Sequence, residues 1–154
     1  MASSIVVRNA REQDIPALAE FNIAMAQETE SKSLSSAKVQ AGMRAVLRQP
    51  DHGFYLVAEW NGRIAGSLLV TREWSDWRNG VFWWIQSVYV PPEFRKRGIY
   101  RALYDAVKTR AKTHPEVCGF RLYVAKGNGA AMSAYARLGM SETEYRIYEE
   151  TLWD

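Results

Sequence analysis

The spacing of hydrophobic positions changes several times along the chain, and each change predicts a new element. Short apolar runs rich in β-branched and aromatic residues predict strands, whereas apolar residues three or four positions apart predict helices. The predicted order is a strand at 5–8, a helix after Asp14, a helix over 39–47, strands at 54–60, 64–71 and 81–90, a helix from Ile99 to His114, a strand at 120–124, a helix after Asn128 and a closing strand at 145–152. This order predicts an α/β (α+β) protein of three layers, a mixed sheet with helices on both faces, formed as one domain over residues 1–154.

Glycines, prolines and polar residues between these runs mark where the elements end. Asn61-Gly62 separates two strands and tolerates the positive φ angles of a tight hairpin, and Pro91-Pro92 removes two N–H donors and so ends the strand before it. Asn128 is placed to cap a helix, and Gly139 is placed to end it. The polar stretch 27–36 is expected to be a mobile loop.

The composition narrows the class of protein. The only cysteine, Cys118, leaves no intramolecular disulfide, and we expect it to be a small buried residue at the start of a strand. No apolar run is long enough to cross a bilayer and no signal-peptide pattern is present, so we expect a cytoplasmic protein with no membrane partner. The net charge of +3 is modest, which argues against a nucleic-acid partner. His52 and His114 have no partners at metal-ligand spacing, so no metal site is predicted.

A basic turn stands where the strand 81–90 gives way to the next helix. Its sequence is Arg95-Lys-Arg-Gly-Ile-Tyr-Arg101. The first N–H groups of a helix have no internal partners and carry the positive end of the helix dipole, while Gly98 lets the backbone come close to a ligand. Arginine side chains add charge-assisted contacts to phosphate oxygens. This turn therefore predicts an anion site, and a pyrophosphate would suit it.

Two segments resemble signatures of the GNAT superfamily of N-acetyltransferases. Arg95-Lys-Arg-Gly-Ile-Tyr100 is similar to the family's Arg/Gln-x-x-Gly-x-Gly/Ala motif, with Tyr at the second small position, and Val88-Tyr-Val-Pro91 is similar to the strand end before it. Asn128-Gly-Ala-Ala-Met-Ser-Ala-Tyr-Ala-Arg-Leu-Gly-Met140 is similar to Asn-x-x-Ala-x-x-x-Tyr-x-x-x-Gly-Phe, with Met in place of Phe. Since Arg8-x-Ala-x-x-x-Asp14 is also similar to the family's start, the resemblance spans nearly the whole chain. It implies a GNAT-like fold with a mostly antiparallel sheet.

The resemblance implies acetyl-CoA as the co-substrate. It implies that the strand end pairs its backbone with the pantetheine arm, that an N–H near Val88 polarises the thioester carbonyl, and that the Tyr135 hydroxyl protonates the departing thiolate. The cofactor-binding residues that it implies are Val88, Tyr89, Val90, Arg95, Lys96, Arg97, Gly98, Ile99, Tyr100, Arg101 and Asn128.

The residues that would receive the acceptor are less explicit in the sequence. In polyamine acetyltransferases, which the chain resembles in layout, a Glu precedes the pyrophosphate turn, and the matching residue here is Gln86, which cannot act as a base but can orient a water or a substrate. Glu28 or Glu30 is the alternative source of a carboxylate, although either one alone is equally typical of a solvated surface. Trp83 and Trp84 adjoin on a strand and so face opposite sides; we predict that Trp84 lines the acceptor site, with packing across strands as the alternative.

The predicted function is acetyl transfer from acetyl-CoA to a primary amine by direct attack in a ternary complex. A small amine, an amino acid or a polyamine-like compound is the first choice of acceptor, and a protein N-terminus or lysine is the second. The main alternative function is that of a non-catalytic sensor that binds acyl-CoA. A nucleic-acid-binding protein is a second alternative, for which the sequence gives less support. A homodimer is a further option, because two segments offer apolar surface. These are the hairpin that carries Trp74, Trp77, Trp83 and Trp84 and the strand predicted at 145–152.

Overall fold

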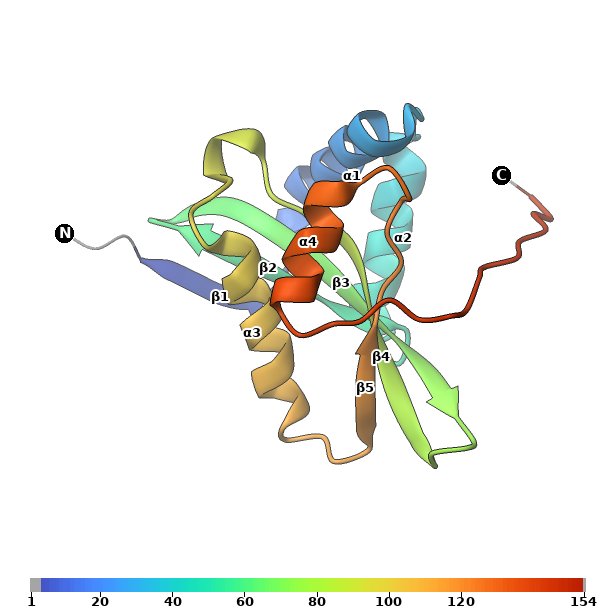
Figure 1. Cartoon of the computed structure of the whole chain (residues 1–154). Coiled ribbons are helices and arrows are strands. Elements are labelled where there is room, and N and C mark those ends of the chain that lie inside the picture. Colours follow the sequence, from blue (N-terminus) through green and yellow to red (C-terminus); the bar gives the residue numbers. More distant parts are fainter. Residues whose placement is uncertain (1–3, 154) are drawn as a thin grey trace. The chain divides into compact units, whose positions relative to one another are not determined.

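The structure, a computed structural model, describes residues 4–153 and divides into two compact units. The first unit ends at Tyr123 and contains a five-stranded sheet in the order β1-β2-β3-β4-β5 (Figure 1). Its strands and helices are β1 (Ile5–Asn9), α1 (Ile15–Glu30), α2 (Ser36–Arg48), β2 (Gly53–Trp60), β3 (Arg63–Ser75), β4 (Gly80–Tyr89), α3 (Ile99–Ala111) and β5 (Val117–Arg121), with 3-10 turns at η1 (Glu12–Asp14) and η2 (Pro92–Phe94).

The sheet is mixed, and most of its pairings are antiparallel. Strands β1 to β4 pair antiparallel in chain order, whereas β5 returns through α3 and pairs parallel to β4. The β2–β3 hairpin turns through Asn61 and Gly62, whose φ angles of 48° and 81° match the left-handed conformation expected of this pair. The predicted sheet type and hairpin are therefore confirmed.

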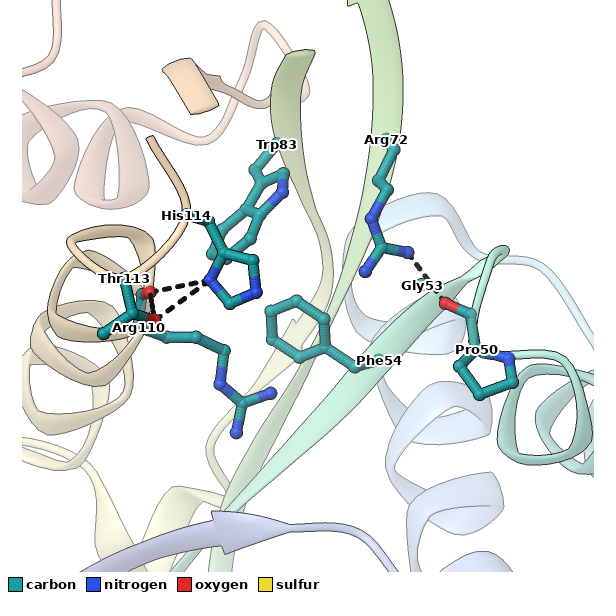
Figure 2. A pocket seen from close by; sticks show the side chains of 8 residues that line it. All are labelled: Pro50, Gly53, Phe54, Arg72, Trp83, Arg110, Thr113 and His114. Carbon is teal, nitrogen blue, oxygen red and sulfur yellow. Dashed lines mark hydrogen bonds between the residues drawn. The ribbon is translucent and has the colours of Figure 1, made fainter. Parts of the chain in front are cut away.

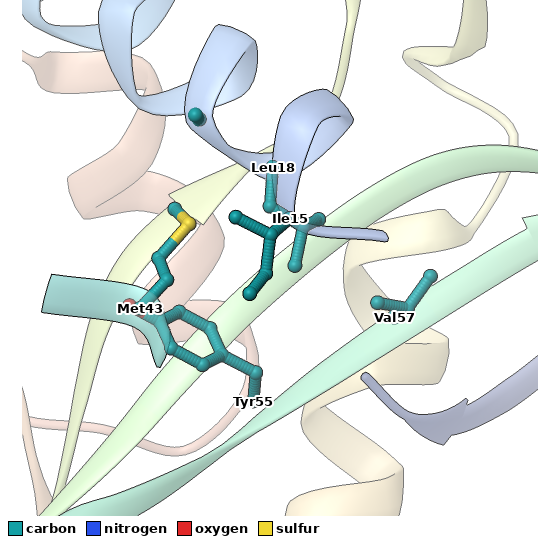
Figure 3. Close-up of a cluster of buried hydrophobic side chains, with 6 residues drawn as sticks. Ile15, Leu18, Met43, Tyr55 and Val57 are labelled. Carbon is teal, nitrogen blue, oxygen red and sulfur yellow. The ribbon is translucent and has the colours of Figure 1, made fainter. Parts of the chain in front are cut away.

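Helices cover both faces of this sheet. On one face, α1 and α2 contribute Ile15, Leu18 and Met43, which pack against Tyr55 and Val57 of β2 (Figure 3). On the other face lies α3, because a Cβ on Gly66 of β3 would come within 2.9 Å of the Ile99 side chain. Alternate residues of β2 point to opposite faces, so one strand serves both layers of the core. The predicted three-layer arrangement is confirmed.

Asp14 precedes α1, but its side chain does not cap that helix. Its carboxylate instead accepts hydrogen bonds from the Arg8 guanidinium at 2.7 and 3.0 Å and from the Arg11 N–H at 2.7 Å. The bond from Arg8, aided by that from Arg11, lowers the pKa of Asp14 although burial opposes the shift. Arg8 also bonds Glu59 of β2. The part-buried ion pair between Arg8 and Asp14 therefore joins β1 to the start of α1.

Three predictions for this unit are wrong in detail. Helix α1 continues through the first four residues of the stretch 27–36 that was expected to be a loop and ends at Glu30, where Ser31 adopts a left-handed φ of 53°. Strand β5 covers Val117–Arg121 rather than 120–124, because its pairing with β4 begins opposite Val81. Cys118 is exposed rather than buried, because β5 is the last strand in the sheet order of this unit and has a single pairing partner there.

The second unit begins at Val124 and contains one helix, α4 (Gly129–Arg137). The Asn128 side chain accepts a hydrogen bond from the Ala131 N–H at 3.2 Å, and Gly139 follows the helix with a φ of 95°. Both predicted helix ends are therefore confirmed. The predicted closing strand 145–152 is wrong: within the described part of this unit the segment joins no ladder, and Tyr145, Ile147 and Tyr148 are exposed. A strand needs a partner for its backbone groups, and alternation of side chains alone does not provide one.

Within residues 4–153 no helix has the length and apolarity needed to span a membrane.

Candidate functional site

A β-bulge at Ser87 and Val88 interrupts β4 immediately before its last residue, Tyr89. Ser67 pairs with Tyr89 and Leu69 pairs with Gln86, so Leu68 alone faces two residues of β4, Ser87 and Val88. Ser87 adopts a φ of 53°, in the left-handed region that side chains other than glycine seldom occupy. A bulge of this kind bends the strand and redirects its backbone groups.

The edge of β4 beyond this pairing is open toward β5 within the first unit. The parallel ladder joins Val81–Trp84 to β5 and stops at the pair Trp84 and Arg121. From Ile85 to Tyr89, the described residues give β4 a ladder partner on the β3 side alone. Unpaired strand edges bind extended chains through main-chain hydrogen bonds. The bulged end of β4 therefore has the geometry of an edge to which an extended chain can pair.

The turn that follows β4 presents backbone N–H groups at the start of α3. Lys96 and Gly98 have left-handed φ angles of 63° and 82°, and Gly98 immediately precedes the helix. The N–H groups of Ile99, Tyr100 and Arg101 have no intrahelical acceptor because they belong to the first turn. A Cβ built on Gly98 meets no atom within 4 Å, so the space beside this turn is open. The turn has the geometry of an anion site.

Side chains of the turn divide into structural and exposed groups. Val90 and Ile99 face the core beside Gly66, so they can offer a ligand their backbone but not their side chains. Arg97 lies 5.1 Å over the Trp60 ring. Lys96 is exposed, and Arg101 is exposed beside Asp105 at 3.7 Å, an ion pair that solvent weakens. Lys96 and Arg101 are therefore the cationic side chains most available to an anion.

Tyr100, which stands at the second small position of the predicted motif, does not obstruct the turn. Its ring stacks on Tyr104 one turn further along α3, with centroids 6.4 Å apart and planes at 23°. Its hydroxyl is buried. The bulky side chain therefore follows the helix, which leaves the N–H groups of the first turn accessible.

Glu28, Tyr89 and Arg95 come together although they are far apart in the sequence. The Tyr89 hydroxyl donates to the Glu28 carboxylate at 2.7 Å, and the Arg95 guanidinium bonds the other oxygen at 2.9 Å. Arg95 also donates to the Val90 carbonyl at 2.8 Å. The bond from Tyr89, followed by that from Arg95, lowers the pKa of Glu28, whereas burial and Glu28 raise the pKa of Tyr89 to about 12. The end of α1 is thus fastened to the end of β4 and the basic turn.

The two other predicted acceptor residues lie on the face of the sheet that carries α1 and α2. The Gln86 amide donates to the Thr71 hydroxyl, so this side chain is oriented by β3. Trp84 faces the ring of Tyr123, with centroids 5.6 Å apart, whereas Trp83 is buried on the opposite face. The predicted separation of the two tryptophans is therefore confirmed.

Asn128 and Tyr135 belong to the second unit. The Asn128 carbonyl oxygen caps α4, which leaves the amide nitrogen as its available donor group. Tyr135 lies in the last two turns of the same helix and is half-buried.

Sequence reasoning missed Ser87, Thr71 and Tyr123. Ser87 was hidden because a bulge depends on the register of two strands, and no local signal marks a serine with positive φ. Thr71 and Tyr123 lie in strand or strand-end positions whose neighbours are known only once the pairing is known. No pattern within the sequence would have singled them out.

A bulged, half-open strand leads into a glycine turn and a helix N-terminus, a geometry that suits an extended ligand with an anionic group. The family comparison agrees: the chain belongs to the acetyltransferase (GNAT) family, whose model matches residues 18–140. The predicted enzyme class, an acetyl-CoA-dependent N-acetyltransferase, is thereby confirmed. The sequence matches no protein of curated function.

Several solved structures resemble this fold over nearly all of the chain. A possible acetyltransferase from Clostridium difficile 630 is 39% identical, with a TM-score of 0.88 over 97% of this chain and 99% of its own. A predicted acetyltransferase from Clostridium acetobutylicum, solved with acetyl-CoA, is 18% identical, with a TM-score of 0.78 over 96% of each chain. Aminoglycoside N-acetyltransferase AAC(6')-Iy, solved with CoA, is 20% identical, with a TM-score of 0.75 over 99% of this chain and 98% of its own. The two more distant structures support the fold alone.

Proposed function

We propose that this enzyme transfers the acetyl group of acetyl-CoA to a small primary amine by direct attack in a ternary complex. The observation that carries the proposal is the bulge at Ser87 and Val88, which leaves the end of β4 open where the strand leads into the anion-binding turn. Acetyl-CoA supplies an activated thioester, and the pantetheine arm is an extended chain with amide groups that suit a strand edge.

The residues from Val88 to Arg101 hold the co-substrate in this proposal. Backbone groups of Val88, Tyr89 and Val90 pair with the pantetheine arm, and an N–H near Val88 stabilises the oxyanion that develops on the thioester. The first N–H groups of α3 and the exposed cations of Lys96 and Arg101 bind the pyrophosphate. Gly98 allows the close approach that a Cβ would hinder.

Three other members of the predicted cofactor set act indirectly in this proposal. The Arg95 side chain donates hydrogen bonds to the Glu28 carboxylate and to the Val90 carbonyl, so it holds the turn in its conformation. Arg97 packs over Trp60, and Tyr100 packs along α3. Asn128 offers its amide nitrogen to the co-substrate, a role that rests on the family signature.

Tyr135 is the proposed general acid. A thiolate leaves the tetrahedral intermediate when the carbon–sulfur bond breaks, and a phenol within hydrogen-bond reach can supply its proton. This assignment rests on the match between residues 128–140 and the family signature, and on the capped helix that carries Tyr135.

Glu28, the carboxylate that the described residues place at the end of β4, is not suited to removing a proton at neutral pH. Glu28 has a lowered pKa, which makes it a weak base, and its two oxygens already bind Tyr89 and Arg95. Gln86 cannot accept a proton, but its fixed amide can orient the amine or a water molecule, and solvent water takes the proton that the ammonium group must lose before attack. Trp84 and Tyr123 offer aromatic faces, to which a cationic amine is attracted before it loses its proton. We therefore assign Glu28 to positioning, and Gln86 and Trp84 to the acceptor site.

The experiment is a thiol-release assay with acetyl-CoA against a panel of small amines, amino acids, polyamines and short peptides, after calorimetric titration of acetyl-CoA. We expect saturable binding and thiol release that depends on a small amine. Release that requires a peptide N-terminus or lysine would favour the protein acceptor. Tight binding with slow release that is indifferent to every amine would favour the non-catalytic sensor, and absence of binding would contradict the proposal.

The predicted cytoplasmic location and homodimer stay predictions. Size-exclusion chromatography with light scattering measures the oligomeric state directly.

A further inference from the structure

A cavity lies at the opposite end of α3 from the anion-binding turn. Its volume is about 410 Å³, and its lining includes Phe54, Trp83, Arg72, Arg110 and His114 (Figure 2). The turn adjoins the first residue of α3, whereas Arg110 is next to the last. A helix of this length separates its ends by roughly 18 Å, so the cavity is not part of the acetyl-CoA site.

The cavity has two cationic side chains and no acidic one in its lining. Arg72 donates to the carbonyl oxygens of Pro50 and Asp51 at 2.8 and 3.3 Å, and Arg110 donates to the Asn9 side-chain oxygen. These partners carry no charge. Among residues 4–153, neither arginine lies within ion-pair distance of a carboxylate. The positive charge at this cavity is therefore not neutralised by a neighbouring acid.

The environment of Arg110 is costly for an unpaired charge. The guanidinium lies 4.4 Å over the Phe54 ring, and its side chain is half-buried. Desolvation lowers the pKa of Arg110 from its ordinary value. A charge that has lost part of its water is stabilised by an anion brought into the same space.

The partly exposed rings of Phe54 and His114 form the other walls of the cavity, and the buried ring of Trp83 lies behind them. Phe54 and Trp83 meet edge to face with centroids 5.2 Å apart, and the His114 ring centroid lies 5.5 Å from that of Trp83. The Nδ1 atom of His114 is bonded to the Arg110 carbonyl at 3.0 Å and to the Thr113 hydroxyl at 3.1 Å. Figure 2 shows the second ring nitrogen directed into the space between His114, Phe54 and Arg72. The walls thus offer aromatic surface and one further hydrogen-bonding atom.

We propose that this cavity binds a small organic anion, a carboxylate carried on a flat aromatic body, at a site separate from that of acetyl-CoA. The guanidinium groups of Arg72 and Arg110 attract the carboxylate, and the ring packs against Phe54 and His114, in front of the buried Trp83. Planar guanidinium groups and aromatic faces are complementary to these two parts of the ligand.

The probe is benzoate, with benzamide as an uncharged compound of the same shape. Both are titrated into the full chain saturated with coenzyme A, so that the anion-binding turn is occupied. The Trp83 indole N–H signal in a proton–nitrogen correlation spectrum reports the cavity, and a Trp83→Phe variant assigns it. We expect benzoate to shift this signal saturably and benzamide to bind at least about tenfold more weakly.

Variants connect this binding to the two arginines. Arg72→Gln and Arg110→Gln should each weaken benzoate about tenfold, whereas Arg63→Gln, an exposed arginine of the β2–β3 hairpin, should not change it. Arg72 is exposed and serves as the variant with less risk to folding. Equal binding of benzoate and benzamide, an unmoved Trp83 signal, or competition between benzoate and coenzyme A would overturn the proposal.

Discussion

The Tyr89 hydroxyl donates a 2.7 Å hydrogen bond to the carboxylate of Glu28. The two residues are 61 positions apart, one on the bulged strand and the other near the end of α1. Arg95 of the basic turn bonds the same carboxylate, so one acidic group joins three elements. The negative charge of Glu28 therefore holds the strand end and the turn in their relative positions.

Replacing Glu28 with Gln tests whether this residue positions the turn or removes a proton. Gln retains an acceptor for Tyr89 but loses the ion pair with Arg95. Because that pair is partly exposed, we expect the KM for acetyl-CoA to rise about fivefold or less, with kcat nearly unchanged. Glu30→Gln is the control, since Glu30 pairs with exposed Lys32 at 3.6 Å. A fall in kcat of about 100-fold at constant KM would instead identify Glu28 as the base.

Gly98→Ala tests the close approach at the turn. The φ of 82° is unfavourable for alanine, so we expect a loss of roughly 1 kcal/mol in the free energy of unfolding together with weaker acetyl-CoA binding. Gly42→Ala is the matched control, because Gly42 lies in α2 with open space around it. That change should stabilise the protein by about 0.5–1 kcal/mol and leave binding intact. Equal binding by both variants would show that the turn does not approach the ligand.

The bulge is tested at Ser87. Glycine accepts a φ of 53° without strain, so Ser87→Gly should stabilise the protein by about 0.5–1 kcal/mol and retain transfer. A β-branched residue resists this conformation, so Ser87→Val should cost about 1–2 kcal/mol and reduce thiol release. Urea unfolding and the thiol assay measure the two effects. Full activity in Ser87→Val would mean that transfer does not depend on the bulge.

The family and the order of elements were predictable because they depend on local signals. The helix ends at Asn128 and Gly139, the Asn61-Gly62 hairpin and the basic turn all follow from neighbouring residues. The bulge and the grouping of Glu28 with Tyr89 depend on pairings between distant segments, which hydrophobic spacing does not encode. The predicted strand 145–152 failed for the same reason, since a strand exists only with a partner ladder. The prediction that Cys118 is buried was also wrong, because the exposure of a residue in a strand depends on what covers that face of the sheet and not on the residue type.

Tyr135→Phe tests the general acid. Removing the hydroxyl should lower kcat by about 100-fold or more while leaving the affinity for acetyl-CoA unchanged, since the proton is needed only as the thiolate departs. Tyr148→Phe is the control in the same unit, because Tyr148 is 94% exposed. Unchanged turnover in Tyr135→Phe would remove its catalytic role.

The lowered pKa of Asp14 leads us to expect that the free energy of unfolding depends on pH. Its pKa is lowered in the folded state, so its stabilising effect is present above the ordinary value of 3.8 and is lost as the pH falls through the lower folded value. Asp14→Asn should therefore reduce the free energy of unfolding by on the order of 2 kcal/mol at pH 7. The gap from the unmodified protein should narrow below pH 3.8. Urea unfolding at a series of pH values checks this, and a gap that widened in acid would contradict the assignment.

The central claim is that acetyl-CoA binds along the bulged end of β4 and the first turn of α3. The most direct measurement is a titration of acetyl-CoA followed by backbone amide shifts in a proton–nitrogen correlation spectrum. We predict the largest shifts at Val88, at Gly98 and at the first residues of α3, saturating together with the calorimetric binding curve. Saturable binding that leaves these amides unmoved would contradict the account.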